Sequence, residues 1–140
     1  MRNEHSAILR LVSRLGGLSH DVKRRDDAER ARALILDIDH LLRGHLARED
    51  ADLYPAMMGA ADPRTRALGT SAAGEMGGLL GVWTDYRDHW TVATILGGTR
   101  RFAAVTGGVI GALSLRIEME NDVLYPAMDR PDGGAARDAA

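Results

Sequence analysis

The sequence has no cysteine, few aromatic residues and no marked excess of charge of either sign. The lack of cysteine among 140 residues excludes disulfides, thiolate metal ligands and thiol redox chemistry. Eighteen basic and twenty acidic side chains leave a formal net charge of −2, so nothing favours binding to nucleic acid or to an anionic membrane. There is no run of 18 apolar residues and no signal-peptide pattern at the start. We therefore expect a cytoplasmic protein that binds neither nucleic acid nor membrane.

Apolar residues recur at helical spacing along most of the chain. Leu34, Ile38 and Leu41 follow one another in steps of four and three, and the same stripe continues to His45 and Glu49. These residues therefore share one face of one helix. No segment alternates with period two, so strands are not expected. The breaks between segments predict four helices, at residues 3–22, 27–58, 71–95 and 99–128.

Polar, proline-containing or glycine-containing segments separate the predicted helices. Asp26 and Asp27 are candidate caps of the second helix. Asp62-Pro63 and the small residues that follow, up to Ser71, are expected to connect the second helix to the third. Gly97-Gly98-Thr99 precedes the fourth helix.

A pattern in the first half of the chain returns 71 positions later. Glu49 corresponds to Glu120, and each is followed at the same distance by Leu-Tyr-Pro. A period of 71 is too long for a solenoid repeat and indicates a duplicated helical hairpin. We predict an all-α fold, an up-down-up-down four-helix bundle over residues 1–128. The Gly-, Ala- and Asp-rich segment 129–140 is expected to be a disordered tail.

Glycine is abundant, and three of the sixteen glycines lie inside the predicted fourth helix. Gly107, Gly108 and Gly111 would each weaken an isolated helix by roughly 1 kcal/mol relative to alanine. We expect close approach of another helix to offset this cost, with the bulky Trp83 and Trp90 as candidate neighbours.

Four ionisable side chains are expected to converge in the core of the bundle. His45 and Glu49 are four residues apart and so lie together on a face that is otherwise apolar. The repeat brings Glu120 to the level of Glu49, and His5 lies at a matching level on the first helix. Two neighbouring buried carboxylates are costly unless positive charge lies between them. Two imidazoles and two carboxylates suit iron, manganese or zinc.

At this point the sequence resembles a known family, the hemerythrin-like (HHE cation-binding) domains. The resemblance rests on His5, His45-x-x-x-Glu49, Leu53-Tyr54-Pro55, Glu120 and Leu124-Tyr125-Pro126. Members are four-helix bundles with a non-haem di-iron centre. Some bind O2 reversibly, and others are linked to oxygen, nitric oxide or peroxide handling and to iron storage or repair. The resemblance implies that the two histidines bind one iron and that the two glutamates bridge both irons.

The sequence departs from the family pattern at the second iron. The resemblance implies imidazoles at positions 76 and 116, and often another one helical turn earlier, where this chain has Met76, Arg116 and Ala72. Methionine only removes a ligand. Arginine has no lone pair to offer and pairs readily with carboxylates. We expect Arg116 to reach Glu120, and also Glu49, from the place of the second metal.

Two functional hypotheses follow from this pattern. In the first, the protein has a reduced, mononuclear site for iron, zinc or manganese, and an open position takes O2, NO or peroxide in sensing or handling these molecules or iron. A dinuclear iron centre is the weaker version. In the second, Arg116 replaces a metal, and the metal-free bundle is a regulatory or interaction module that forms a homodimer or binds a partner helix. The sequence supplies no dedicated general base or substrate pocket, so an enzymatic role such as a peroxidase is a third, weaker hypothesis.

Four further residues lie close in sequence to the candidate ligands. Tyr54 is a candidate for contact with a metal or its bound oxygen species, although it and Tyr125 are more typical of helix-end packing. Glu4 and Glu75 could orient ligands from behind, but an acid in the first turn of a helix is more often solvated. These two glutamates are therefore expected at the surface.

Overall fold

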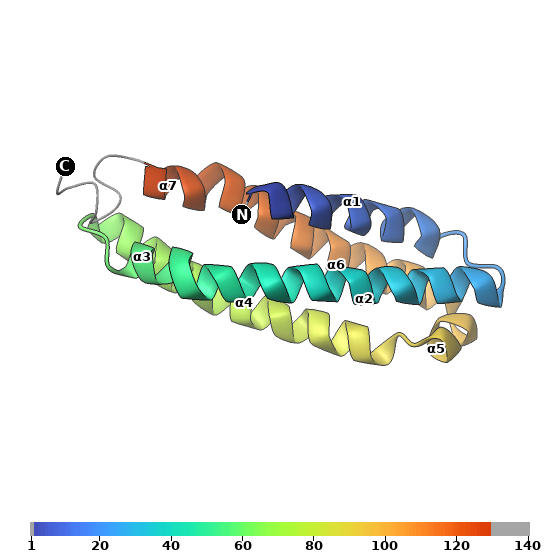
Figure 1. Cartoon of the computed structure of the whole chain (residues 1–140). Coiled ribbons are helices and arrows are strands. Elements are labelled where there is room, and N and C mark those ends of the chain that lie inside the picture. Colours follow the sequence, from blue (N-terminus) through green and yellow to red (C-terminus); the bar gives the residue numbers. More distant parts are fainter. Residues whose placement is uncertain (1, 130–140) are drawn as a thin grey trace.

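The computed structural model describes residues 2–129, and these residues are almost entirely helical (Figure 1). No strand occurs among them, which confirms the all-α prediction. The predicted tail falls outside the described residues except for Asp129. The helices are α1 (Arg2–Ser19), α2 (Arg25–Arg48), the π-helical turn η1 (Glu49–Leu53), α3 (Tyr54–Met58), α4 (Pro63–His89), α5 (Val92–Gly97), α6 (Thr99–Met119), the π-helical turn η2 (Glu120–Leu124) and α7 (Tyr125–Asp129).

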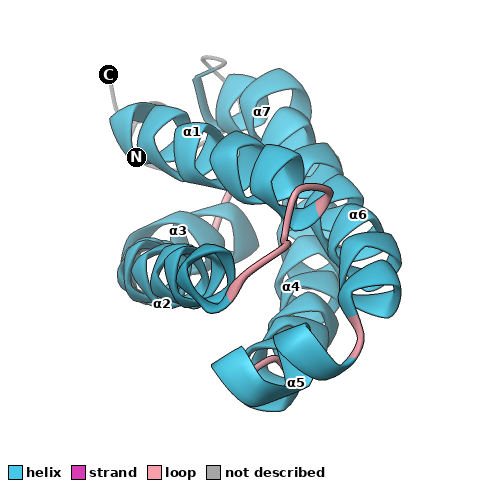
Figure 2. Ribbon diagram, turned by 90° about the vertical axis from the view of Figure 1, so that its right-hand side faces the viewer, coloured by secondary structure: helices cyan, strands magenta, loops and turns pink. Residues whose placement is uncertain are grey.

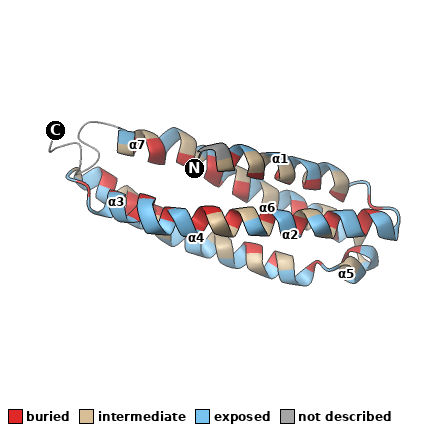
Figure 3. Ribbon diagram, viewed as in Figure 1, coloured by how far each residue is buried: buried red, intermediate tan, exposed pale blue. Residues whose placement is uncertain are grey.

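The long helices lie lengthwise beside one another. Helix α2 continues through η1 into α3, and α6 continues through η2 into α7 (Figures 1 and 2). Helix α1 packs on α2 and α6, whereas α4 packs on α3 and α6. Buried and exposed residues alternate at helical spacing along each of them (Figure 3), so the apolar stripes read from the sequence face one another in a common core.

The expected connection between the second and third helices is wrong. Helix α4 begins at Pro63 instead of residue 71. Asp62 caps it, since the Asp62 carboxylate accepts a hydrogen bond from the backbone N–H of Arg64. Proline is favoured in the first turn because its missing N–H would have no helical partner there. The small residues that follow therefore continue a helix.

Capping also sets the ends of two other helices. At the start of helix α2, the Asp27 carboxylate accepts hydrogen bonds from the backbone N–H groups of Lys23 and Arg24. Asp27 lies in the first turn of the helix and so holds the preceding loop in place. These backbone hydrogen bonds lower the pKa of Asp27. The predicted third helix ends earlier than expected, at His89, because Thr91 caps the separate helix α5. The first helix likewise ends before residue 22.

The glycines of α6 do not lie against another helix, contrary to expectation. A Cβ atom built on Gly107, Gly108 or Gly111 would meet no atom within 4 Å. Trp83 and Trp90 are buried, but neither approaches these positions. The helix propensity lost at these glycines is therefore not recovered by packing against other residues of the described range 2–129.

Gly69 in α4, by contrast, allows a close approach between helices. A Cβ atom at Gly69 would lie 2.6 Å from the Cβ atom of Met57 in α3. We expect Gly69→Ala to destabilise the fold by about 1–3 kcal/mol through overpacking. Gly77→Ala, at an exposed position of the same helix with open space around it, should stabilise it by about 0.5–1 kcal/mol. Urea unfolding measures both free energies, and changes of the same sign would contradict this packing.

The continuous helical rod Thr99–Asp129 contains a window of mean hydropathy 1.4, which is apolar and long enough to cross a membrane. Length and composition alone are weak evidence, since core helices of soluble proteins pass the same test. This rod also carries the buried charged residues Arg116 and Glu120.

Candidate metal centre

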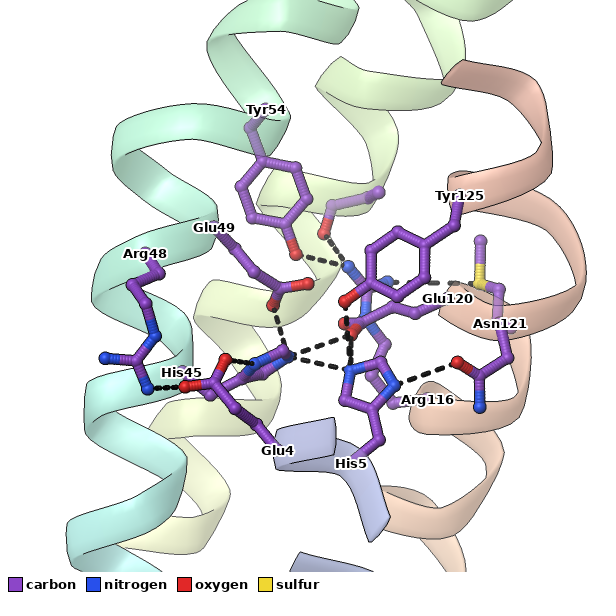
Figure 4. Close-up of polar contacts among 12 residues, drawn as sticks. Glu4, His5, His45, Arg48, Glu49, Tyr54, Arg116, Glu120, Asn121 and Tyr125 are labelled. Carbon is purple, nitrogen blue, oxygen red and sulfur yellow. Dashed lines mark hydrogen bonds and ion pairs between the residues drawn. The ribbon is translucent and has the colours of Figure 1, made fainter. Parts of the chain in front are cut away.

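Four side chains from four elements converge near one end of the core. His5 comes from α1, His45 from the last turn of α2, Glu49 from η1 and Glu120 from η2 (Figure 4). Each is at most 2% exposed, and one potential ligand atom from each lies within 4.8 Å of all the others. The structure thus brings together all four residues that the sequence singled out as ligands.

The separations of the ligand atoms are close to those around a single ion. The Nε2 atoms of His5 and His45 are 2.8 Å apart. Oε1 of Glu120 lies 2.7 Å from Nε2 of His5 and 3.1 Å from Nε2 of His45. Oε1 of Glu49 lies 3.3 Å from Nε2 of His45. Ligands bonded tetrahedrally at about 2.0–2.1 Å are separated by about 3.3 Å.

Two π-helical turns place the carboxylates at the centre. Glu49 is the first residue of η1, and Glu120 is the first residue of η2. Pro55 and Pro126 follow directly in α3 and α7. Proline lacks an N–H and clashes with the carbonyl four residues before it, and the wider π turn relieves that conflict. Such turns are frequent at functional sites.

Both imidazoles are oriented from behind by hydrogen bonds. Nδ1 of His45 donates to Oε1 of Glu4 at 2.9 Å, and Glu4 is itself paired with Arg48. Nδ1 of His5 donates to Oδ1 of Asn121 at 3.0 Å. Each ring therefore has Nε2 available at the centre, the arrangement found in metal-binding histidines. The expectation of a solvated acid was wrong for Glu4.

Arg116 lies beside this cluster and holds one of its carboxylates. Its Nε donates to Oε2 of Glu120 at 3.2 Å, and its Nη2 donates to the Tyr54 hydroxyl at 2.6 Å and to the Ala72 carbonyl at 3.0 Å. The guanidinium is buried. The expected contact with Glu49 is not formed, because neither carboxylate oxygen of Glu49 has a hydrogen-bond partner among the described residues.

Comparison with known proteins agrees with this geometry. A family model described as the hemerythrin HHE cation binding domain matches residues 1–128. The chain belongs to this family. No curated protein and no solved structure matched it.

The second metal position of the hemerythrin pattern is filled by other groups. At the two positions where the family pattern has imidazoles, this chain has Met76, a buried thioether, and the buried Arg116. Glu75 lies 3.8 Å from Nη1 of Arg116 and is 64% exposed, as expected for a solvated acid. A guanidinium repels a cation and donates no electron pair, so this hemerythrin-like chain does not fit a second metal ion.

The two tyrosines of the Leu-Tyr-Pro motifs have different neighbours. The Tyr125 hydroxyl lies 3.1 Å from Nε2 of His5, and the two rings stack with centroids 5.3 Å apart. Tyr54 instead accepts from Arg116, and burial followed by the nearby Glu49 raises the pKa of its hydroxyl. Tyr125 is thus the tyrosine whose hydroxyl contacts a candidate ligand directly, whereas the Tyr54 hydroxyl is bonded to Arg116. Both tyrosines occur in the same motif, so the sequence held no signal that could separate them.

The buried charges are unevenly balanced. Burial raises the pKa of Glu49. Burial acts in the same direction on Glu120, but hydrogen bonds from His45 and His5 outweigh it and hold the pKa of Glu120 below its usual value. Burial would lower the pKa of His45, yet its hydrogen bond to Glu120 and the negative charge of the adjacent Glu49 raise that pKa to about 9. A metal ion bound here takes the place of the His45 proton.

Proposed function

We propose that this hemerythrin-like protein binds one metal ion through His5, His45, Glu49 and Glu120. Glu49 carries the proposal, because its carboxylate is fully buried and neither oxygen receives a hydrogen bond from the described residues 2–129. Nε2 of His45 lies 3.3 Å from Oε1 of Glu49 but forms no hydrogen bond with it, and a buried carboxylate that accepts no hydrogen bond costs several kcal/mol. Arg116 does not offset this cost, because its donors are directed to Glu120, Tyr54 and Ala72. A divalent cation bound among the four residues would offset the cost of burying the Glu49 carboxylate.

The donor set suits iron, zinc or manganese. A bound iron would supply an open coordination position for O2, NO or peroxide, so we propose a role in sensing or handling these molecules or iron, without catalysis. Asn121 and Glu4 fix the tautomers of the two histidines. Arg116 engages Oε2 of Glu120, which leaves Oε1 for the metal and favours binding by one oxygen.

A metal-free function is the second candidate. It is favoured by the hydrogen bonds of Arg116, which already satisfy one carboxylate without a metal. The observation against it is the buried Glu49 carboxylate, which accepts no hydrogen bond from the described residues.

We further propose that the helices form an up-down-up-down four-helix bundle that arose from a duplicated hairpin. The lengthwise packing of α1, α2, α4 and α6 supports this arrangement (Figure 1). The two π turns, which begin at equivalent positions of the sequence repeat, support the duplication.

Metal titration of chelator-treated protein tests the function. We expect Fe(II), Zn(II) or Mn(II) to saturate at one equivalent per chain in calorimetry, and elemental analysis of protein purified without chelator to give the same stoichiometry. Bound metal should raise the unfolding midpoint, and EDTA should reverse that change. Absence of binding by all three ions, with no effect of EDTA on stability, would favour the metal-free function.

Glu4 should contribute to metal affinity although it is not a ligand. Glu4→Ala removes the acceptor that fixes Nδ1 of His45, so we expect the affinity to fall by roughly 10- to 100-fold, as for other residues that orient ligands. Glu75→Ala is the matched control, because Glu75 is the equivalent residue in the repeat and contacts only Arg116 from the surface. Equal losses in calorimetric titrations of both variants would argue against an orienting role for Glu4.

A further inference from the structure

One exposed face of α6 is free of charge over several turns. We call it the α6 face, and it consists of Ala104, Gly107, Gly108, Gly111, Ala112 and Leu115, all exposed. Leu115 is 68% exposed, the highest value among the large apolar side chains described. The positions around it are glycines with open space where a side chain would project. The face therefore has a protruding apolar side chain next to a shallow depression.

Charges of opposite sign flank the two ends of the α6 face. Arg100 and Arg101 are exposed at its start, and Glu118 and Asp122 are exposed at its end. Within residues 2–129, none of these four has an ion-pair partner. An antiparallel copy of this helix would present its acidic end to the basic end of the first.

We propose that the α6 face binds the α6 face of a second copy of this chain in an antiparallel, twofold-symmetric dimer. A twofold axis beside Gly111 and Ala112 places Leu115 level with Gly108 of the second copy. The same axis places Arg101 level with Asp122 of the second copy. Symmetry repeats this pair at the other end of the helix, and the two pairs are about 32 Å apart along the helix axis. One register thus satisfies both the shape and the charges. This proposal goes beyond the proposed function and does not depend on metal.

The two kinds of contact have separate roles in such a dimer. Leu115 of each copy would be buried over Gly107, Gly108 and Gly111 of the other, where the missing side chains let the helices approach closely, and apolar burial stabilises the pair. The terminal charge pairs would select the antiparallel orientation, because a parallel alignment brings like charges together.

A lipid surface is the competing occupant of the α6 face, since α6 belongs to the apolar rod Thr99–Asp129. The same rod contributes Glu120 and Arg116 to the core, so inserting it would dismantle the candidate metal centre. The acidic end of the face would also be repelled by anionic headgroups. A second copy would present opposite charges to both the basic and the acidic end of the face, whereas an anionic membrane would attract only the basic end.

Sedimentation of the full chain from roughly 10 to 500 μM, the range in which a small helical interface dissociates, tests the proposal. We expect dimers in the wild type and at least about 10-fold weaker association for Leu115→Asp. The control is Leu36→Asp, at an exposed leucine of α2, which should dimerise normally. If circular dichroism shows that Leu115→Asp is unfolded, Gly108→Leu is the second variant, because its side chain would fill the depression and should likewise weaken the dimer.

Charge reversal tests the orientation of the dimer. Arg101→Glu should weaken the dimer, and adding Asp122→Arg to the same chain should restore it, because each reversed charge meets the other across the twofold axis. A wild type that stays monomeric would overturn the proposal. So would a dimer that none of these variants weakens, or a monomer that floats with anionic phospholipid vesicles.

Discussion

Replacement of His45 by alanine is expected to lower metal affinity by at least about 100-fold. Nε2 of His45 lies within 3.3 Å of ligand atoms of His5, Glu49 and Glu120, so it is central to the site. Four-ligand protein sites bind zinc with about 10–16 kcal/mol in all. Losing one ligand should therefore cost about 3 kcal/mol. Calorimetric titration with Fe(II) and Zn(II) measures the change directly.

His40→Ala is the matched control for this experiment. His40 lies on the same helix but on its exposed face, whereas His45 lies on the buried face. Its loss should therefore leave the stoichiometry and affinity of metal binding unchanged. If His45→Ala still bound one equivalent with the affinity of the wild type, the metal site would have to lie elsewhere in the chain.

Replacement of Arg116 by methionine is expected to destabilise the metal-free protein by about 3–5 kcal/mol. The substitution leaves Oε2 of Glu120 buried without its donor, and removing one partner of a buried ion pair has this order of cost. Urea unfolding in the presence of EDTA measures the loss. A variant as stable as the wild type would show that the hydrogen bonds of Arg116 contribute little to the fold.

The same position should control how many metal ions the site can hold. The double variant Met76→His, Arg116→His removes the fixed positive charge next to Oε2 of Glu120 and restores imidazoles at the two positions where the family pattern has them, so we expect binding to rise from one to two equivalents. Met76→His alone keeps the guanidinium and should remain at one equivalent. If the double variant also stopped at one, something other than Arg116 would exclude the second ion.

These results would also separate the two candidate functions. A protein in which Arg116 fully replaces a metal should have every buried carboxylate hydrogen-bonded, yet no described residue donates a hydrogen bond to Glu49. Under the proposed function, Arg116 replaces one of two metal ions at most. The wild type should be stable without metal and become more stable with one.

The sequence by itself determined the helices and which residues share a face. Steps of three and four residues fix neighbours along one helix, which is a local property. This is why His45 and Glu49 could be assigned to one side of α2, and why the repeat indicated Glu120. Helix starts were less accurate at Pro63, because a run of small residues is compatible with either a helix or a loop.

Only the tertiary structure decided which residues meet across the bundle. Such contacts depend on how far each helix is rotated about its axis and shifted along its neighbours. That geometry decided three hydrogen bonds, which join Glu4 to His45, Tyr125 to His5 and Tyr54 to Arg116. It also directed the hydrogen bonds of Arg116 to groups other than Glu49 and turned the glycines of α6 to the surface. Local spacing carries no information about these rotations, because they result from the packing of the whole core.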